Sequence, residues 1–311
     1  MSQNPLALTV YYWGMELQNR LLVECLGPAF EELVSGGALR RFWFERYDAR
    51  GPHVFTLLLP HPGGEDEVRR TLDSRLGAFL TRHPSTEGLS REMLEQRHAE
   101  CRGRIQGDAD ALPGIADNNT YLLLPHSPEG YPYNLSRHLP GHEEIWDLVG
   151  DLSRWVIGRL DSESYKPIPE AIRFAMALDR EIERAGADPK LYWQYHASTL
   201  LPALATRLQT GDPTLLERLP EILGDANLAL FTRFWRRFEP DPIPWQPLPR
   251  LLELTLEGAL DRDPGSAKEV SWRVQREIDH TLFKQLALPV IQHIPIALFA
   301  LWRRVDSGGS S

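Results

Sequence analysis

The sequence predicts an α+β protein, with an N-terminal antiparallel sheet of split βαβ character followed by a mostly α-helical half. Short β-branched and aromatic runs alternate with amphipathic stretches up to residue 124, and helical patterns dominate after Gly141. A chain of 311 residues with 42% hydrophobic side chains can also bury a sizeable core without disulfides. We expect a sheet unit over residues 1–140 and a helical unit over 141–311, packed on each other as one compact protein.

The first strand and helix follow from residue type and spacing. Leu6 to Trp13 is rich in β-branched and aromatic residues, which favours a strand. Glu16 to Val34 repeats apolar residues at spacings of three, four and one, which predicts a helix. Pro28 should kink this helix, and Gly36-Gly37 should end it.

A hairpin, a second helix and a last strand complete the predicted sheet unit. Phe42 to Asp48 and His53 to Leu59 flank a turn that contains Gly51-Pro52, which predicts the hairpin. Glu65 to Thr81 places apolar residues four apart, which indicates a helix, and Asn119 to Leu124 has the composition of a strand. The order strand, helix, strand, strand, helix, strand puts both helices on one face of an antiparallel sheet.

The second half carries clear helix starts. Asp188-Pro189 and Asp212-Pro213 each supply an N-cap acceptor followed by proline at the first helical position. A further helix is expected from His142 to Leu160. Five prolines between residues 240 and 249 cannot lie inside a helix, so they should form a rigid loop between helices at 227–238 and 251–260.

Composition argues against several function classes. With 34 Lys and Arg against 43 Asp and Glu, the net charge of -9 disfavours nucleic acid and anionic membrane surfaces as partners. Cys25 and Cys101 lack any metal-ligand spacing and are expected to be reduced thiols. No secretion signal opens the chain, and Pro289 and Pro295 interrupt the apolar stretch 286–302. We therefore expect a cytoplasmic protein without a membrane span.

Common cofactor and nucleophile motifs are absent from the sequence: it has no phosphate-binding P-loop, no G-x-G-x-x-G after a strand, no H-E-x-x-H and no G-x-S-x-G. No cofactor and no metal are expected.

Two weaker patterns have two readings each. His138 and His142 could ligate a metal or lie exposed at a helix start. Residues 231–238 interleave aromatic and basic side chains, either as a nucleic-acid surface or, as the acidic composition favours, as an amphipathic helix that buries its aromatic residues. Those aromatic residues are Phe234, Trp235 and Phe238.

Several segments together share the pattern of one known family. Residues 43–48 (Trp-Phe-Glu-Arg-Tyr-Asp) follow an aromatic strand and a helix, and residues 51–54 (Gly-Pro-His-Val) open the next strand. Residues 137–141 (Arg-His-Leu-Pro-Gly) precede the helix at 142–160, and residues 292–294 (Gln-His-Ile) lie near the C-terminus. In this order they resemble the thiopeptide-type bacteriocin biosynthesis domain, the glutamate-eliminating C-terminal part of lantibiotic dehydratases, which also occurs as a free-standing protein. The resemblance covers nearly the whole chain and implies a tailoring enzyme of ribosomally made peptides, with a lyase-type reaction.

Glutamate elimination from glutamylated Ser or Thr, which yields dehydroamino acids, needs a base for the α-proton, a donor for the enolate oxygen and a cation for the departing carboxylate. The resemblance suggests His293 as the base, with Arg137 or Arg46 in the other roles. Each residue also has a purely structural reading: His293 as a buried core histidine, Arg46 as a strand arginine paired with Glu45 or Asp48, and Arg137 as part of a surface loop.

The sequence departs from the eliminating members of this family. Residues 54–57 (Val-Phe-Thr-Leu) contain no arginine, the Arg-Tyr-Gly-Gly segment is altered at 137–141, and residues 295–298 replace an expected Asn-Arg pair. Related free-standing proteins carry out the pyridine-forming aza-[4+2] cycloaddition of two dehydroalanines with leader release. That reaction depends on proximity in an aromatic-lined pocket.

The aromatic runs of the sheet supply candidates for substrate binding or, alternatively, simply sheet core. These candidates are Tyr12, Trp43, Tyr47 and His53, with Tyr11 and Trp13 in the same runs. A third reading is a non-catalytic module whose sheet edge captures a leader peptide by strand addition. The expected partners are a precursor peptide with leader and core and a glutamylating protein; nucleic acid and membrane are not expected, and a homodimer stays open.

Overall fold

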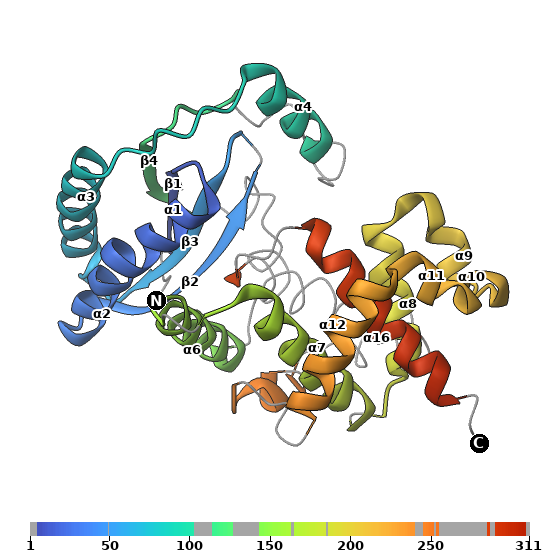
Figure 1. Ribbon diagram of the computed structural model, residues 1–311. Helices are drawn as coiled ribbons and strands as arrows, with labels where there is room; N and C mark the ends of the chain where they lie inside the picture. The colour runs from blue at the N-terminus through green and yellow to red at the C-terminus, as the bar shows by residue number, and fades with distance from the viewer. Residues whose placement is uncertain are drawn as a thin grey trace. The chain divides into compact units, whose positions relative to one another are not determined.

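The computed structural model describes residues 5–48, 50–102, 114–126, 143–162, 165–184, 186–239, 245–251, 253–254, 285–286 and 290–308 (Figure 1). The chain folds as two units, residues 1–163 and 164–311. The first contains a four-stranded antiparallel sheet, and the described part of the second is helical. The predicted α+β class is confirmed.

The sheet has the topology that the element order predicted. Its strands are β1 (Leu6–Tyr11), β2 (Leu39–Tyr47), β3 (His53–Pro60) and β4 (Thr120–Pro125). They lie in the order β2-β3-β1-β4, and each neighbouring pair is antiparallel. β1 and β2 are therefore parallel to each other with β3 between them, which is the split βαβ arrangement. The predicted hairpin corresponds to β2 and β3.

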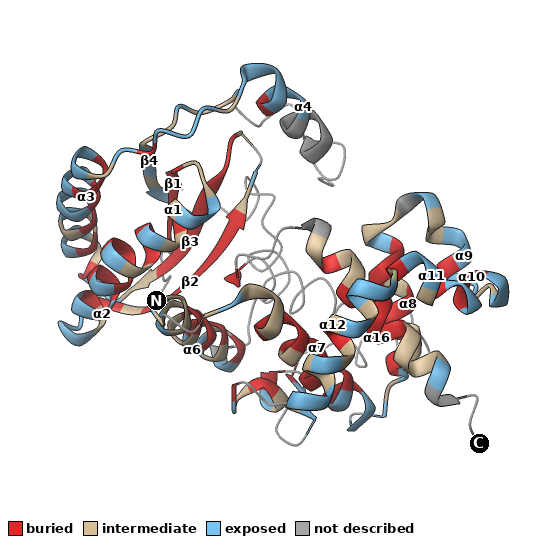
Figure 2. Cartoon of the chain, in the orientation of Figure 1, coloured by how far each residue is buried: buried red, intermediate tan, exposed pale blue. Residues whose placement is uncertain are grey.

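Helices cover one face of this sheet. They are α1 (Met15–Leu21), the π-helical turn η1 (Leu22–Leu26), α2 (Gly27–Ser35) and α3 (Glu65–Arg82). Phe30 of α2 lies 4.3 Å from Phe42 of β2, between ring centroids, and α3 packs against α2 and η1. β1, β2 and β3 are buried along most of their length, as the red segments of Figure 2 show. Burial of this apolar face is the main stabilising contribution to the unit.

The predicted helix over 16–34 is present, but it is not uniform. Pro28 has no N–H to donate to the carbonyl one turn earlier, and the preceding residues widen into the π-helical turn Leu22–Leu26. Pro28 itself lies in the first turn of α2, where proline is tolerated.

α6 (Glu143–Leu160) packs against the outer strand β2. The Trp146 ring stacks on Trp43 at 5.8 Å, and Arg41 forms an ion pair with Asp147 at 2.6 Å. A Cβ at Gly150 would lie 3.2 Å from the carbonyl oxygen of Phe42, so helix and strand are close. α6 therefore belongs to the same unit as the sheet. The sequence becomes helical at residue 141, whereas the boundary between the units lies after residue 163.

The second unit is built from short and long helices around α16 (Val290–Gly308). This helix packs against α7 (Pro167–Arg184), α8 (Pro189–Leu200), α11 (Leu219–Leu223) and α12 (Asp225–Phe238). The predicted caps are confirmed: the Asp188 side chain accepts from the Lys190 amide at 2.8 Å, and that of Asp212 accepts from the Thr214 amide at 2.9 Å. The other described helices of this unit are η3 (Pro202–Leu204), α9 (Ala205–Gln209) and α10 (Pro213–Glu217). One more described helix, α4 (Arg91–Arg102), belongs to the first unit.

Some sequence predictions concern residues outside the described ranges or in the proline-rich segment. The pair His138 and His142 lies outside the described residues, as does most of the predicted helix at 251–260. In the proline-rich segment, Trp245 and Leu248 are buried. Over the described residues, no helix combines the length and apolar character needed to cross a membrane.

Candidate functional site

Three aromatic rings form a row across one end of the sheet, on the face opposite α1, α2 and α3. The strand register places Tyr11 of β1 beside His53 of β3, and His53 beside Tyr47 of β2. The Tyr11 and His53 rings lie 5.0 Å apart between centroids, and the His53 and Tyr47 rings stack at 5.8 Å. We call this set the Tyr11–His53–Tyr47 row. Tyr11 and His53 are buried, whereas Tyr47 is half-buried at the end of β2.

The imidazole of His53 has one nitrogen fixed by the turn that precedes β3. Its Nδ1 lies 2.8 Å from the carbonyl oxygen of Gly51. A carbonyl oxygen only accepts, so Nδ1 carries the hydrogen and, in the neutral ring, Nε2 holds the lone pair. Gly51 has φ of 112°, a value that favours glycine, and so the turn depends on this residue to present its carbonyl. The arrangement suits His53 to proton transfer through Nε2.

A buried carboxylate stands next to the row. Glu45 lies two residues before Tyr47 on the same face of β2, its exposed fraction is 1%, and its Oε2 accepts a hydrogen bond from the Tyr47 hydroxyl. A carboxylate buried in this way requires hydrogen-bond donors. The Tyr47 hydroxyl is thus held by an acceptor of negative charge, which fixes its orientation.

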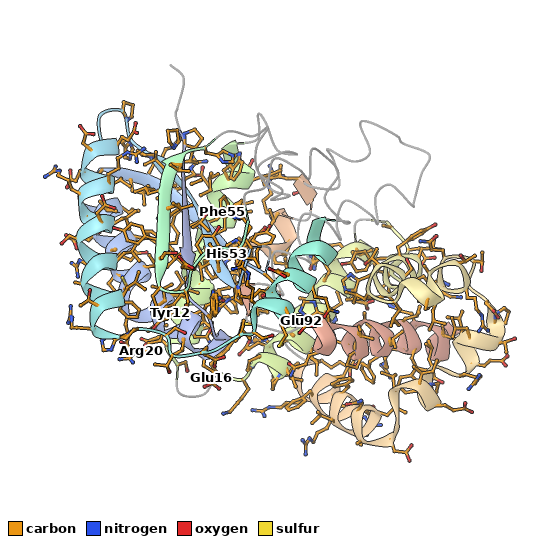
Figure 3. All side chains as sticks on the ribbon, turned by 90° about the horizontal axis from the view of Figure 1, so that it is seen from above. Tyr12, Glu16, Arg20, His53, Phe55 and Glu92 are labelled. Atoms are coloured by element: carbon orange, nitrogen blue, oxygen red, sulfur yellow. The ribbon has the colours of Figure 1, made fainter. Side chains whose placement is uncertain are left out.

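Aromatic residues extend the same sheet face inward from the row. Phe55 lies two residues after His53 on β3 and therefore on the same face of the sheet; both are labelled in Figure 3. The Trp43 ring lies 5.6 Å from Phe55 and is buried, and among the described residues its indole N–H has no hydrogen-bond partner. At the Tyr11 end of the row, the Arg50 guanidinium lies 5.4 Å from the centre of the Tyr11 ring. The face therefore combines aromatic surface, one imidazole, one carboxylate and one nearby cation.

Arg46 and Tyr12, both predicted from the sequence, lie on the helix-covered side instead. The Arg46 guanidinium donates to Asn19 Oδ1 at 2.6 Å, Gln18 Oε1 at 3.4 Å and the Met15 carbonyl at 3.5 Å, which ties β2 to α1. The Tyr12 hydroxyl donates to the carbonyl of His83, the C-cap of α3, at 2.5 Å. These contacts support both elements, and the catalytic role of Arg46 and the substrate-binding role of Tyr12 stay predictions.

The two other residues predicted to be catalytic belong to different parts of the chain. His293 is buried on α16 of the second unit, with an exposed fraction of 2%. Arg137 lies outside the described residues. The structure thus brings Trp43, Tyr47 and His53 together, and the roles of His293 and Arg137 stay predictions.

Glu45 is the functional candidate that the sequence reasoning missed as a site residue, having weighed it only as a partner of Arg46. Consecutive strand residues point to opposite faces, so Glu45 and Arg46 cannot form that pair within β2. The alternation does place Glu45 on the same face as Tyr47 and Trp43. Period-two spacing was therefore the signal that could have found it.

Comparison with known proteins decides the family. A family model described as lantibiotic biosynthesis dehydratase C-term matches residues 6–184, more than half of the chain. The chain belongs to this family. The match confirms the resemblance read from the sequence, and it includes every residue of the Tyr11–His53–Tyr47 row. Membership in this family gives the chain a tailoring role in lantibiotic-type biosynthesis, with a peptide as partner.

Two solved structures share the fold over nearly the whole chain. The structure titled "Pyridine synthase, TbtD, from thiomuracin biosynthesis" is similar with a TM-score of 0.69 and 16% sequence identity, covering 99% of this chain and 100% of that one. The crystal structure of TsrL is similar with a TM-score of 0.51 and 12% identity, covering 100% of this chain and 96% of that one. At such identities the likeness concerns the fold. No curated protein sequence matches the chain.

Proposed function

We propose that this family member catalyses the pyridine-forming aza-[4+2] cycloaddition of two dehydroalanines in a precursor peptide, with release of the leader. The observation that carries the proposal is the Tyr11–His53–Tyr47 row, in which an imidazole with a fixed tautomer lies between two aromatic rings. The fold likeness to a structure titled pyridine synthase, end to end in both chains, supports it.

The chemistry asks for a proton carrier and a shaped surface. The amide that joins one dehydroalanine to its neighbour must move its N–H proton to the carbonyl oxygen to become an azadiene, and His53 Nε2 is suited to carry that proton. Two C–C bonds then close the six-membered ring. Loss of water and of the leader as an amide makes the ring aromatic, so no oxidant is required. The half-buried ring of Tyr47 would offer a flat face to the alkenes, with the buried rings of Tyr11 and Phe55 on the same side of the sheet, and proximity supplies most of the rate enhancement.

Glutamate elimination is the second candidate, because the matched family is that of lantibiotic dehydratases. It needs a cation for the departing carboxylate. Arg46 is hydrogen-bonded to α1 on the other face of the sheet. Arg50, by contrast, lies above the Tyr11 ring and so places a positive charge near the row. In this reading Arg50 joins Arg137 and His293 as candidates for that reaction.

A non-catalytic leader-binding module is a weaker candidate. The sheet has two edge strands, and α6 already packs against one of them, β2. Strand addition would therefore use the outer edge of β4, where Arg69 Nη1 of α3 already donates to the Leu123 carbonyl at 3.0 Å. Pro125 at the end of the strand has no N–H to offer. Both features oppose pairing with an added strand.

Mass spectrometry separates these readings. The full chain is incubated with one peptide that carries two dehydroalanines and with another that carries glutamylated serines. We expect the first to become a macrocycle with leader release and the second to stay unchanged. Loss of glutamate from the second peptide would establish elimination, and no covalent change in either would leave only the binding module.

Variants of His53 test the residue that carries the proposal. His53→Asn places an amide donor near the position of Nδ1 but removes Nε2, so the fold should persist while product formation falls by roughly 100-fold or more. His61→Ala is the matched control, because His61 is exposed just beyond the end of β3. Wild-type turnover in a folded His53→Asn protein would overturn the role of His53.

A further inference from the structure

One face of α12 carries three exposed arginines. Arg233, Arg236 and Arg237 lie on one arc of the helix, since positions three and four apart share a face. In the part of the chain that the structure describes, none of the three forms an ion pair. Their charge is therefore available to a partner.

Aromatic rings border these arginines. Phe234 and Phe238 stack at 6.2 Å with an interplanar angle of 9°. Both are half-buried, as is Trp235, the third aromatic residue of the predicted amphipathic helix. Arg233 lies over the Phe234 ring at 5.4 Å, and Arg237 lies over the Phe238 ring at 5.7 Å. Such stacking holds the guanidinium groups against apolar surface.

The neighbouring helix α7 adds to this surface. The Arg173 guanidinium lies 5.9 Å from the centre of the Phe238 ring, on which Arg237 also rests. Arg180 Nη2 donates to the carbonyl of Glu239 at 2.6 Å, which fixes the end of α12 against α7. We call Arg173, Arg233, Phe234, Arg236, Arg237 and Phe238 the basic aromatic surface.

This surface contrasts with the net charge of the chain and with other arginines of the second unit. The chain has a net charge of -9, and other arginines of the second unit, such as Arg207 and Arg218, lie beside Asp212 and Glu221. A concentrated positive patch on an acidic protein steers negatively charged partners to one place.

We propose that the basic aromatic surface docks an acidic segment of the peptide substrate that also bears apolar side chains. Carboxylates of that segment would pair with the arginines, and its apolar side chains would cover Phe234 and Phe238. The inference rests on the proposed function in that the substrate is a precursor peptide. A peptide fits better than nucleic acid because the overall negative charge repels a long polyanion, whereas a short segment meets only the local positive field.

Binding to defined peptides tests the proposal. A fluorescently labelled peptide of glutamate, leucine and phenylalanine is compared with a counterpart that carries glutamine in place of glutamate, by anisotropy on the full chain. We expect the glutamate peptide to bind more tightly, and salt to reduce the difference. The triple variant Arg233→Gln, Arg236→Gln and Arg237→Gln should weaken its binding by roughly tenfold, as the loss of three exposed charge contacts implies. Equal binding of the two peptides, or unchanged binding by the triple variant, would overturn the proposal.

Two controls make the result specific. Arg218→Gln removes an exposed arginine of the same unit that already pairs with Glu221 at 3.1 Å, and it should bind the glutamate peptide like the wild type. A labelled oligonucleotide that binds more tightly than the glutamate peptide, and is lost in the triple variant, would identify a nucleic-acid surface and contradict the proposal.

Turnover separates this inference from the proposed reaction. The triple variant should convert a short substrate with two dehydroalanines and no acidic segment as fast as the wild type. If the wild type converts no such substrate yet binds the glutamate peptide through these arginines, the proposed reaction fails and the docking surface stands.

Discussion

At the scale of single residues, the side of a strand on which a residue lies decides what it can do. Tyr47 and Glu45 lie on one face of β2 and are joined by a hydrogen bond, while Arg46 between them lies on the other and binds α1. The three are consecutive in sequence, yet they serve two different surfaces. The role of a strand residue in this family member therefore depends more on the face of the sheet on which it lies than on its residue type.

The Tyr47 hydroxyl should stabilise the protein through Glu45. Tyr47→Phe takes a donor from a carboxylate whose exposed fraction is 1%, so we expect the free energy of unfolding to fall by about 1–3 kcal/mol. Adding Glu45→Gln should recover part of this loss, because the neutral amide costs less to bury. Urea denaturation of both single variants and the double variant measures the coupling. Strictly additive effects would show that the two side chains do not interact in solution.

Cys25 should be unreactive in the native protein. Its exposed fraction is 4%, and burial raises the pKa of its thiol to about 11, so very little thiolate is present at pH 8. In a Cys101→Ser variant, Ellman's reagent should label almost no thiol until denaturant is added, and one thiol thereafter. Rapid labelling of the folded variant at pH 8 would show that α1, η1 and α2 open readily.

How far the site could be predicted follows from these residues. Trp43, Tyr47 and His53 were selected from local sequence, and the register does place them on one face of the sheet. The partners of Arg46 could not be predicted, because Asn19 is 27 residues away and meets it only after α1 packs on the sheet. Alternation along a strand predicts which residues share a face of the sheet, whereas hydrogen bonds between elements depend on tertiary packing.

At the scale of elements, helix starts were the most predictable feature. The pairs Asp188-Pro189 and Asp212-Pro213 act through bonds within three residues, so no distant contact is needed to form them. The placement of α6 was harder to foresee. Its position beside β2 depends on contacts of Arg41 and Trp43 of the strand with the helix and on the small residue Gly150, and strand and helix are far apart in sequence.

The cap of α8 provides an element-scale prediction. Asp188→Ala removes the acceptor for the amides of Lys190 and Leu191 and should lower the free energy of unfolding by about 1 kcal/mol. Asp188→Asn keeps a capping oxygen and should cost much less. Asp306→Ala, at an exposed position inside α16, is the matched control. Thermal unfolding of the three variants measures the differences, and equal losses for Ala and Asn at position 188 would contradict the capping role.

At the scale of the whole molecule, side chains far apart in sequence hold the second unit together. Arg304 near the end of α16 donates through Nε to Asp179 Oδ1 and Oδ2 at 3.0 Å, and Trp193 Nε1 of α8 donates to the same carboxylate at 2.9 Å. Asp179 is buried, with an exposed fraction of 4%. One carboxylate thus joins α7, α8 and α16.

Removing the cation of this cluster should be costly. Arg304→Met keeps much of the apolar stem but leaves Asp179 buried without its charge partner, and we expect a loss of about 3 kcal/mol in the free energy of unfolding. Asp179→Asn in the same background should restore part of the stability, since it removes the uncompensated charge. Denaturant unfolding of the single and double variants checks this, and a fully stable Arg304→Met protein would show that the cluster is not needed.

The pH dependence of the cluster follows from Glu183. The hydrogen bond from Arg304 lowers the pKa of the Glu183 carboxyl below its usual value, more than the partial burial raises it. Because the folded-state pKa lies below the unfolded one, the stabilisation is fully present above the unfolded pKa of about 4.3 and is lost as the pH falls through the folded value. Glu183 is 60% exposed, so water screens the pair and its contribution is only a few tenths of a kcal/mol. Glu183→Gln should therefore be slightly less stable than the wild type at pH 7 and equally stable once the pH has fallen below the folded-state pKa of Glu183. A difference that persists or grows in acid would assign the effect of this substitution to packing rather than to charge.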